Sequence, residues 1–118
     1  MARISTHVLD MANGRPAGGL RIDLFSIKEG VREPVSCAVT NLDGRTDEPL
    51  LAGETLTIGI FELVFHAAEY LHLQGHPLSD PPFLDEVVIR FGIAETAGNY
   101  HVPLLLSPYG YSTYRGSL

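Results

Sequence analysis

Turn signals recur along this chain at short intervals, and this spacing limits the possible folds more than any other feature. Glycine, proline, asparagine and aspartate separate short apolar stretches that suit β-strands better than helices, so the spacing predicts an all-β sandwich or barrel. The signals are Asn13-Gly14, Gly18-Gly19, Asp43-Gly44, Gly53, Asp80-Pro81-Pro82, Gly98-Asn99 and Pro108 with Gly110.

The apolar stretches also show the alternation that half-buried strands require. Leu20, Ile22 and Leu24 are separated by single residues, which places them on one face of a strand. Pro103 has no N–H group, so the strand that contains it must have an edge or a bulge there. The predicted strands are Ile4–Asp10, Leu20–Lys28, Pro34–Thr40, Thr55–Phe65, Asp85–Ile93, Tyr100–Leu106 and Gly110–Tyr114, with a short further strand near Leu50–Ala52.

One segment departs from the strand pattern. Residues from Ala67 to Gln74 are rich in helix formers and are followed by Gly75, which predicts a short helix with a glycine C-cap. No linker or internal repeat divides the chain, so residues 1–118 are expected to form a single domain.

The size of the chain restricts where a binding site can lie. A chain of 118 residues buries roughly two-thirds of its unfolded surface, which leaves little material for a deep cleft. A sizeable pocket is therefore expected between subunits.

The net charge of −6 argues against nucleic-acid binding, and no apolar run reaches the roughly 18 residues of a membrane helix. With Cys37 as its only cysteine and no secretory signal pattern, the protein is expected to be soluble and cytoplasmic.

The five histidines are the first candidates for chemistry. His72 and His76 have the spacing of two metal ligands on one helical face, but Gly75 and Pro77 should end the helix at that point. No cysteine lies nearby and no His-Glu-x-x-His pattern is present, so no metal site is predicted. These two histidines and His66 are interpreted as structural or exposed residues.

The remaining polar residues carry no signature of their own. Taken singly, His7 and His101 are ordinary strand histidines, Arg45 is part of an Asp-Gly-Arg turn, and Ser117 belongs to a chain end of the kind that is usually frayed. There is no G-x-S-x-G nucleophile elbow and no glycine-rich phosphate loop. The pattern alone therefore predicts a small β-sandwich with scattered polar residues.

Three longer segments resemble the signatures of the transthyretin-related family. They are Ser5–Ala17 (STHVLDMANGRPA), Thr40–Arg45 (TNLDGR) and Tyr100–Ser117 (YHVPLLLSPYGYSTYRGS). The resemblance extends from about Ile4 to Ser117, nearly the whole chain. The ending Tyr114-Arg115-Gly116-Ser117 is similar to the enzyme branch of the family, not to the hormone-carrier branch, although the chain continues to Leu118.

The resemblance implies a sandwich of two four-stranded sheets with one short helix, assembled as a homotetramer (a dimer of dimers) with sites in a channel between dimers. The enzyme branch acts in purine catabolism on 5-hydroxyisourate, the labile product of urate oxidation. It adds water to the C6 carbonyl of this cyclic amide and cleaves the N1–C6 bond. The product is 2-oxo-4-hydroxy-4-carboxy-5-ureidoimidazoline, and no metal or cofactor is needed.

The resemblance also implies catalytic positions at His7, Arg45, His101 and Ser117. Histidine suits a general base because its unperturbed pKa is about 6.5. We expect His7 to activate the water, with Arg45 nearby to keep its imidazole neutral and to bind the planar substrate. His101 would bind or polarise the substrate, and its role is exchangeable with that of His7. Ser117 would position the water or shuttle a proton.

The tail residues Tyr114 and Arg115 are expected to line the site, bind substrate and anchor the chain end.

Two alternatives to an enzyme remain. A carrier would bind an apolar aromatic ligand in the same channel, but three basic side chains there would be costly to desolvate without polar partners. A scaffold protein with no small ligand would leave the basic residues unexplained.

Overall fold

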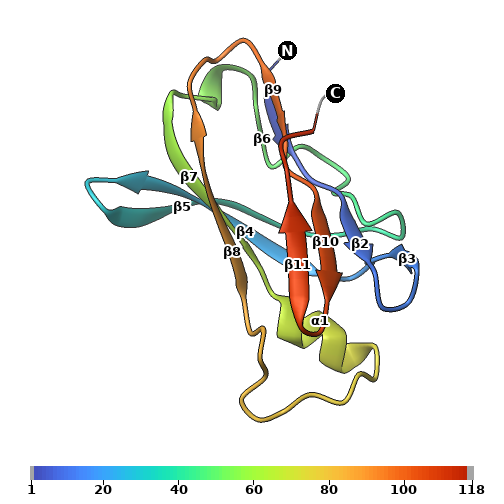
Figure 1. Ribbon diagram of the computed structural model, residues 1–118. Coiled ribbons are helices and arrows are strands. Elements are labelled where there is room, and N and C mark those ends of the chain that lie inside the picture. The colour runs from blue at the N-terminus through green and yellow to red at the C-terminus, as the bar shows by residue number, and fades with distance from the viewer. Residues whose placement is uncertain (1, 117–118) are drawn as a thin grey trace.

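The computed structural model of the chain describes residues 2–116, which form two layers of strands with an α-helix at one end (Figure 1). The elements in chain order are β1 (Arg3–Ser5), β2 (Val8–Asp10), β3 (Arg15–Pro16), β4 (Arg21–Lys28), β5 (Val31–Val39), β6 (Leu51–Ala52), a 3₁₀ turn η1 (Gly53–Thr55), β7 (Gly59–Phe65), α1 (Ala67–Leu73), β8 (Val87–Ile93), β9 (Asn99–His101), β10 (Leu104–Ser107) and β11 (Gly110–Thr113).

The first layer is a four-stranded antiparallel sheet in the order β5-β4-β7-β8. Ile22 and Leu24 of β4 are fully buried, and in the cross-strand register Ile22 pairs with Phe65, which pairs in turn with Val87. The alternation seen in the sequence therefore places the apolar face of this sheet against the other layer. A register shift between Leu24 and Phe25 interrupts the β4–β5 pairing.

The second layer contains two strands that are each divided into two parts. The sheet β11-β10-β2-β3 continues into β6-β1-β9, because β1 runs on into β2 and β9 runs on into β10. The two divided strands are parallel neighbours, and their interruptions lie side by side. Val102 N donates to Ser5 O at 2.9 Å and Leu104 N donates to His7 O at 2.9 Å, so the ladder holds across the break. The irregularity predicted at Pro103 is confirmed, as is a sandwich of two four-stranded sheets.

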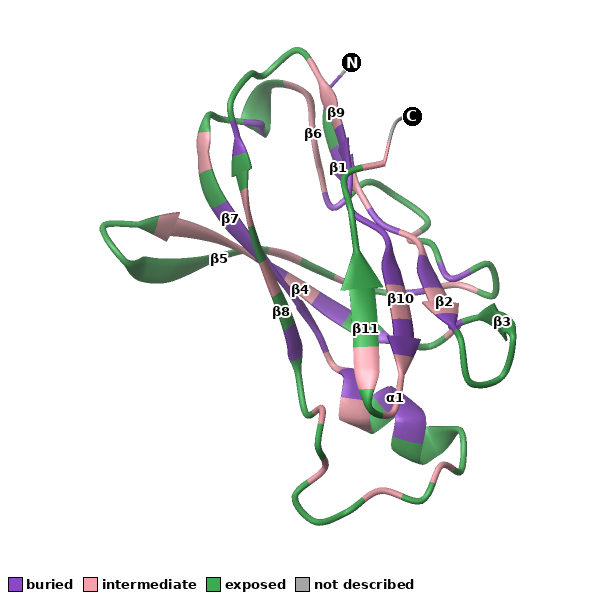
Figure 2. Cartoon of the chain, viewed as in Figure 1, coloured by how far each residue is buried: buried purple, intermediate pink, exposed green. Residues whose placement is uncertain are grey.

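The core lies between the two layers, and its buried positions are on strands of both layers and on α1 (Figure 2). The helix α1 closes one end of the sandwich and buries Ala67, Tyr70 and Leu71. The Tyr70 hydroxyl donates to Asp10 Oδ2 at 2.7 Å, which ties the helix to the end of β2. Gly75 has a φ of 83°, as the predicted glycine cap requires. Within residues 2–116 no helix is long and apolar enough to span a membrane.

The strand predicted as Ile4–Asp10 is divided into β1 and β2, and the strand expected from Asp85 begins at Val87. The starts of two other strands were further from the structure, and one strand was missed. The strand expected from Pro34 begins at Val31, because β5 lies at the edge of its sheet, where a proline without an N–H is tolerated. The strand expected from Thr55 begins at Gly59, because the residues before it form the 3₁₀ turn. The short strand β3 pairs with β2 through only two residue pairs and carries no alternation that could predict it.

Candidate active site

The candidate site lies on the face of β1 and its continuation that points away from the core. Along this segment Ile4, Thr6 and Val8 are buried, whereas Arg3, Ser5 and His7 alternate with them and are exposed or partly exposed.

Because this strand buries every second residue, it presents a row of polar side chains on its outer face.

His101, the last residue of β9, lies opposite Ser5 in the parallel pairing and is only 8 % exposed. Its Nδ1 is hydrogen-bonded to Ser5 Oγ at 2.9 Å, which fixes the orientation of the ring. The tail passes directly over this histidine, since Gly116 N donates to His101 O at 2.8 Å. A Cβ atom at Gly116 would lie 2.7 Å from His101 Cδ2, so glycine allows the tail to approach the ring.

Arg45 reaches the same face from the turn after Asp43 and Gly44. It forms an isolated antiparallel bridge with His7. The turn is held by Asn41, whose backbone N donates to Arg45 O at 2.7 Å and whose side-chain Oδ1 accepts from Arg45 N at 3.2 Å. The structure therefore brings His7, Arg45 and His101 together from three separate parts of the chain.

The electrostatic environment of His101 keeps its imidazole neutral. Burial lowers the pKa of His101, and the nearby charges of Arg45, His7 and Arg3 lower it further. Both effects act in the same direction because a second positive charge is disfavoured in a desolvated, cationic setting. His101 is therefore suited to hydrogen bonding as a neutral group near pH 7.

A shallow hollow of about 250 Å³ opens beside this cluster. Its walls include Arg3, Ser5 and Arg45 together with the segment 46–49. A larger hollow of about 520 Å³ lies on the other side of that segment, but it is lined by none of the predicted site residues. The smaller hollow is lined by Arg45 but by neither histidine, and it holds the carboxylates of Asp47 and Glu48 as well as two guanidinium groups. It is therefore the better candidate for a pocket that holds part of the substrate beside the histidines.

The predicted tail residues take different positions. Tyr114 is 60 % exposed and lines, with Arg115, a hollow between β8 and β11. The Arg115 guanidinium lies 4.4 Å from the ring centroid of Tyr100 and donates to Asn99 O at 3.3 Å. Arg115 thus attaches the tail to β9, beside the histidine cluster. Ser117 lies outside the described residues.

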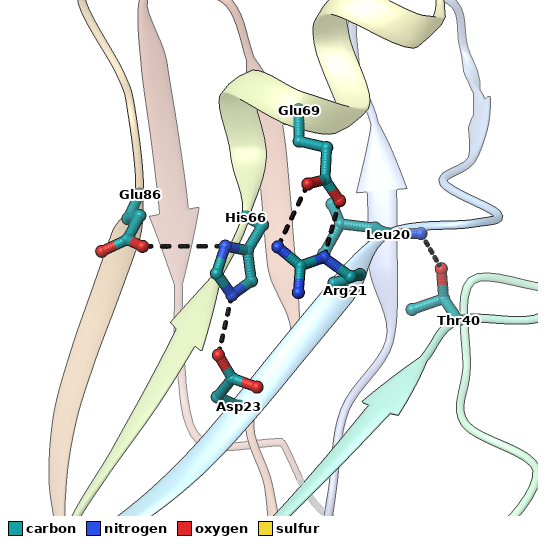
Figure 3. Close-up of polar contacts among 7 residues, drawn as sticks. All are labelled: Leu20, Arg21, Asp23, Thr40, His66, Glu69 and Glu86. Atoms are coloured by element: carbon teal, nitrogen blue, oxygen red, sulfur yellow. Dashed lines mark hydrogen bonds and ion pairs between the residues drawn. The ribbon is translucent and has the colours of Figure 1, made fainter.

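The other histidines lie away from this face. His66 Nε2 is 2.7 Å from Asp23 Oδ2, and its Nδ1 is 3.6 Å from Glu86 Oε2, so it connects β4 with the segment that leads into β8 (Figure 3). His76 Nε2 lies 3.3 Å from Asn13 Nδ2. In the part of the chain that the structure describes, no three His, Cys, Asp or Glu residues are grouped so that they could hold a metal ion.

Two residues of this face were not among the predicted site residues. Ser5 is the first residue of a family signature, and Arg3 lies just outside that signature. The alternation of Arg3, Ser5 and His7 with buried residues is the signal that places them together. A period-two reading of the first strand, extended to its polar face, would have found both.

Gly44 offers a test of how the Arg45 turn is held. Its φ is +77°, and a Cβ atom there would collide with the Val8 carbonyl oxygen and lie 3.2 Å from Ala17 N. We expect Gly44→Ala to destabilise the fold by at least about 3 kcal/mol, from left-handed strain plus the collision, and so to lower the Tm by about 10 °C or more. Because Arg45 would move with the turn, the activity proposed below should fall as well.

Gly14→Ala is the matched control, since Gly14 also has a positive φ of 67° but open space around its Cβ position. Gly14→Ala should lower the free energy of unfolding by only about 1 kcal/mol. Equal melting temperatures for the two variants would show that the close approach of Gly44 to Val8 does not hold the turn.

The fold and the site together define a class of protein: a two-layer transthyretin-type β-sandwich with a basic cluster on the outer face of one sheet. Residues 4–116 match the model of the HIUase/Transthyretin family. The chain belongs to this family.

Individual relatives refine this placement. The chain is 56 % identical over 115 residues to 5-hydroxyisourate hydrolase 2 of Rhizobium meliloti (strain 1021), covering 98 % of this chain and 96 % of the relative. It is similar to the solved structure of Klebsiella pneumoniae 5-hydroxyisourate hydrolase, with 33 % identity, a TM-score of 0.81 and coverage of 99 % and 100 %. A crystal structure of (S)-allantoin synthase gives 43 % identity and a TM-score of 0.92 over 98 % of this chain, which corresponds to 44 % of that longer chain.

Proposed function

We propose that this protein hydrolyses 5-hydroxyisourate to 2-oxo-4-hydroxy-4-carboxy-5-ureidoimidazoline in urate catabolism. The observation that carries the proposal is the convergence of His7, Arg45 and His101 on one sheet face. The high identity to a hydrolase over nearly the full chain supports the same reaction. Hydrolysis of a cyclic amide needs a base for water and donors for the oxyanion, and these three side chains supply both.

In the proposed mechanism His7 is the general base. It is less buried than His101, so it can accept a proton from water at a lower desolvation cost. The water oxygen adds to C6, and the resulting tetrahedral oxyanion collapses as the C6–N1 bond breaks. The proton taken by His7 is then delivered to N1, so that one water molecule is consumed and the ring opens. A positioned base of this kind contributes about 10²–10⁴-fold to the rate.

His101 and Arg45 are assigned to the oxyanion and the substrate. If the Ser5 hydroxyl donates to Nδ1 of His101, the proton of the neutral ring lies on Nε2, from which it can be donated to the C6 oxygen. The lowered pKa of His101 makes it a donor that remains neutral during the reaction. Arg45 presents a planar fork to the heterocycle and adds positive charge where the oxyanion develops.

The remaining parts of the proposal concern the tail, the assembly and the compartment. Ser117 would position the water, and Tyr114 and Arg115 would wall the site and bind substrate. A homotetramer built as a dimer of dimers would cover this open sheet face and turn the shallow hollow into an enclosed channel. The exposed, unpaired Cys37 is consistent with a reducing cytoplasm.

We expect the reaction to need no metal. The proposed site pairs two histidines with an arginine, and within residues 2–116 no carboxylate or thiolate is grouped with these histidines as a zinc site requires. Activity should therefore be unchanged after prolonged dialysis against a chelator and desalting, measured beside an untreated sample. A loss of activity that only added metal restores would contradict this mechanism.

A carrier is the second candidate, because the family to which the chain belongs includes transthyretin. The basic residues on the site face disfavour an apolar ligand there. Reaction in ¹⁸O-labelled water, followed by mass spectrometry, separates the two functions. The hydrolase predicts one ¹⁸O atom in the new carboxylate at an enzyme-dependent rate. Labelling at the rate of the uncatalysed control would refute hydrolysis.

A further inference from the structure

Arg3 lies on the same outer face as the proposed catalytic groups. It is the first residue of β1, two residues before Ser5 and four before His7, and its side chain is exposed. The alternation of buried and exposed residues along this strand directs all three side chains away from the core. Arg3 and Arg45 also line the same hollow.

These two arginines differ from the others in one respect. Within residues 2–116 neither the Arg3 nor the Arg45 guanidinium has a hydrogen bond or an ion pair. Each of the remaining arginines donates to a side-chain or backbone oxygen: Arg15 to Gln74, Arg21 to Glu69, Arg32 and Arg90 to Glu62, and Arg115 to Asn99. Two unpaired guanidinium groups beside one hollow are what an anion-binding site requires.

The charge balance of the hollow gives Arg3 particular weight. Its lining includes two cations, Arg3 and Arg45, and two carboxylates, Asp47 and Glu48, which cancel. Removal of Arg3 would leave one cation against two carboxylates, so the hollow would become net negative. An anionic product or transition state would then be repelled.

We infer that Arg3 is a further binding residue for the proposed reaction and that, with Arg45, it holds the carboxylate formed when the ring opens. This inference rests on the proposed function. Ring opening converts the neutral C6 carbonyl into a carboxylate, so negative charge develops during the reaction. A second guanidinium therefore stabilises the transition state and product more than the substrate.

A second effect of Arg3 is on His101. Burial is the main cause of the lowered pKa of this histidine, followed by Arg45, His7 and Arg3. Ser5, the remaining polar group bonded to the ring, carries no charge. Loss of the positive charge of Arg3 should therefore raise the pKa of His101, which NMR titration of this ring measures directly.

The test compares Arg3→Gln with Arg3→Lys, which keeps the charge, and with Arg15→Gln, whose exposed arginine contacts Gln74 away from the site. Steady-state hydrolysis is measured across pH at low salt and at about 0.5 M salt, where exposed charges are screened. Arg3→Gln should lower kcat/KM about tenfold at low salt, mainly through kcat. A tenfold loss corresponds to about one charge-assisted hydrogen bond. The deficit should shrink at high salt, and Arg3→Lys should retain most of the activity and leave the pKa of His101 unchanged.

Two results would overturn the inference while wild-type turnover is intact. Arg3→Gln could match Arg15→Gln at every pH and salt concentration. Alternatively, it could lose activity equally at all salt concentrations, without a raised pKa of His101 and without rescue by lysine, as a purely structural residue would. Absence of turnover in the wild-type protein would instead refute the proposed function, and the role of Arg3 would fall with it.

Discussion

Replacement of His7 by alanine is expected to lower kcat/KM for 5-hydroxyisourate by about 100-fold or more, because it removes the base that takes the proton from water. Losses of similar size are expected for Arg45→Ala and His101→Ala, which remove donors to the developing oxyanion. The side chains of His7 and Arg45 lie on the outer face of the sheet, so melting temperatures for these two variants should stay near that of the wild type. Steady-state kinetics beside thermal melting measures both effects.

The remaining histidines provide matched controls. His72→Ala and His76→Ala should retain near-wild-type kcat/KM. His66→Ala should also retain activity, although loss of the contacts to Asp23 and Glu86 should lower its stability. Near-normal turnover in His7→Ala would refute its assignment as the base, and a large loss in His72→Ala would place the site elsewhere.

Deletion of residues 115–118 is expected to abolish most turnover, by about 100-fold or more if the tail supplies a hydroxyl that positions the water and part of the site wall. The described part of this tail makes a cation–π contact to Tyr100 and a backbone hydrogen bond to His101, and contributes little to the core. The melting temperature should therefore change only slightly. Chain ends are usually tolerant of deletion, which makes this loss of activity specific to a functional tail.

Deletion of Leu118 alone is the control for the truncation and should leave turnover unchanged. Arg115→Lys keeps the charge but not the planar group over Tyr100, so it should fall between the wild type and the truncation. Wild-type turnover after the four-residue deletion would mean that the tail is a frayed end without a part in the reaction.

The local pattern of the sequence predicted most of the fold. The alternation through Ile22 and Leu24 identified β4, and the missing N–H of Pro103 located the interruption between β9 and β10. Both signals depend only on residues close together in the chain. β3 was missed because two residues carry no periodicity, and the start of β5 was misplaced because the tolerance of Pro34 depends on the edge position of the strand.

The site was less accessible to local reasoning because it depends on pairing between distant segments. His7 and His101 lie on neighbouring strands only because β1 and β2 run parallel to β9 and β10. Arg45 joins them through a turn whose Gly44 must lie against Val8. Only the family resemblance suggested that these residues act together, and it did not point to Arg3.

Hydrolase activity is tested most directly by multiple turnover of freshly prepared 5-hydroxyisourate. The protein is added at a concentration far below that of the substrate, and the ultraviolet absorbance of the substrate is followed beside buffer and heat-denatured protein. We predict decay of the whole substrate pool at a rate proportional to protein concentration and well above the spontaneous rate. Decay at the spontaneous rate, with at most a stoichiometric amount of substrate bound, would refute hydrolysis and indicate a carrier.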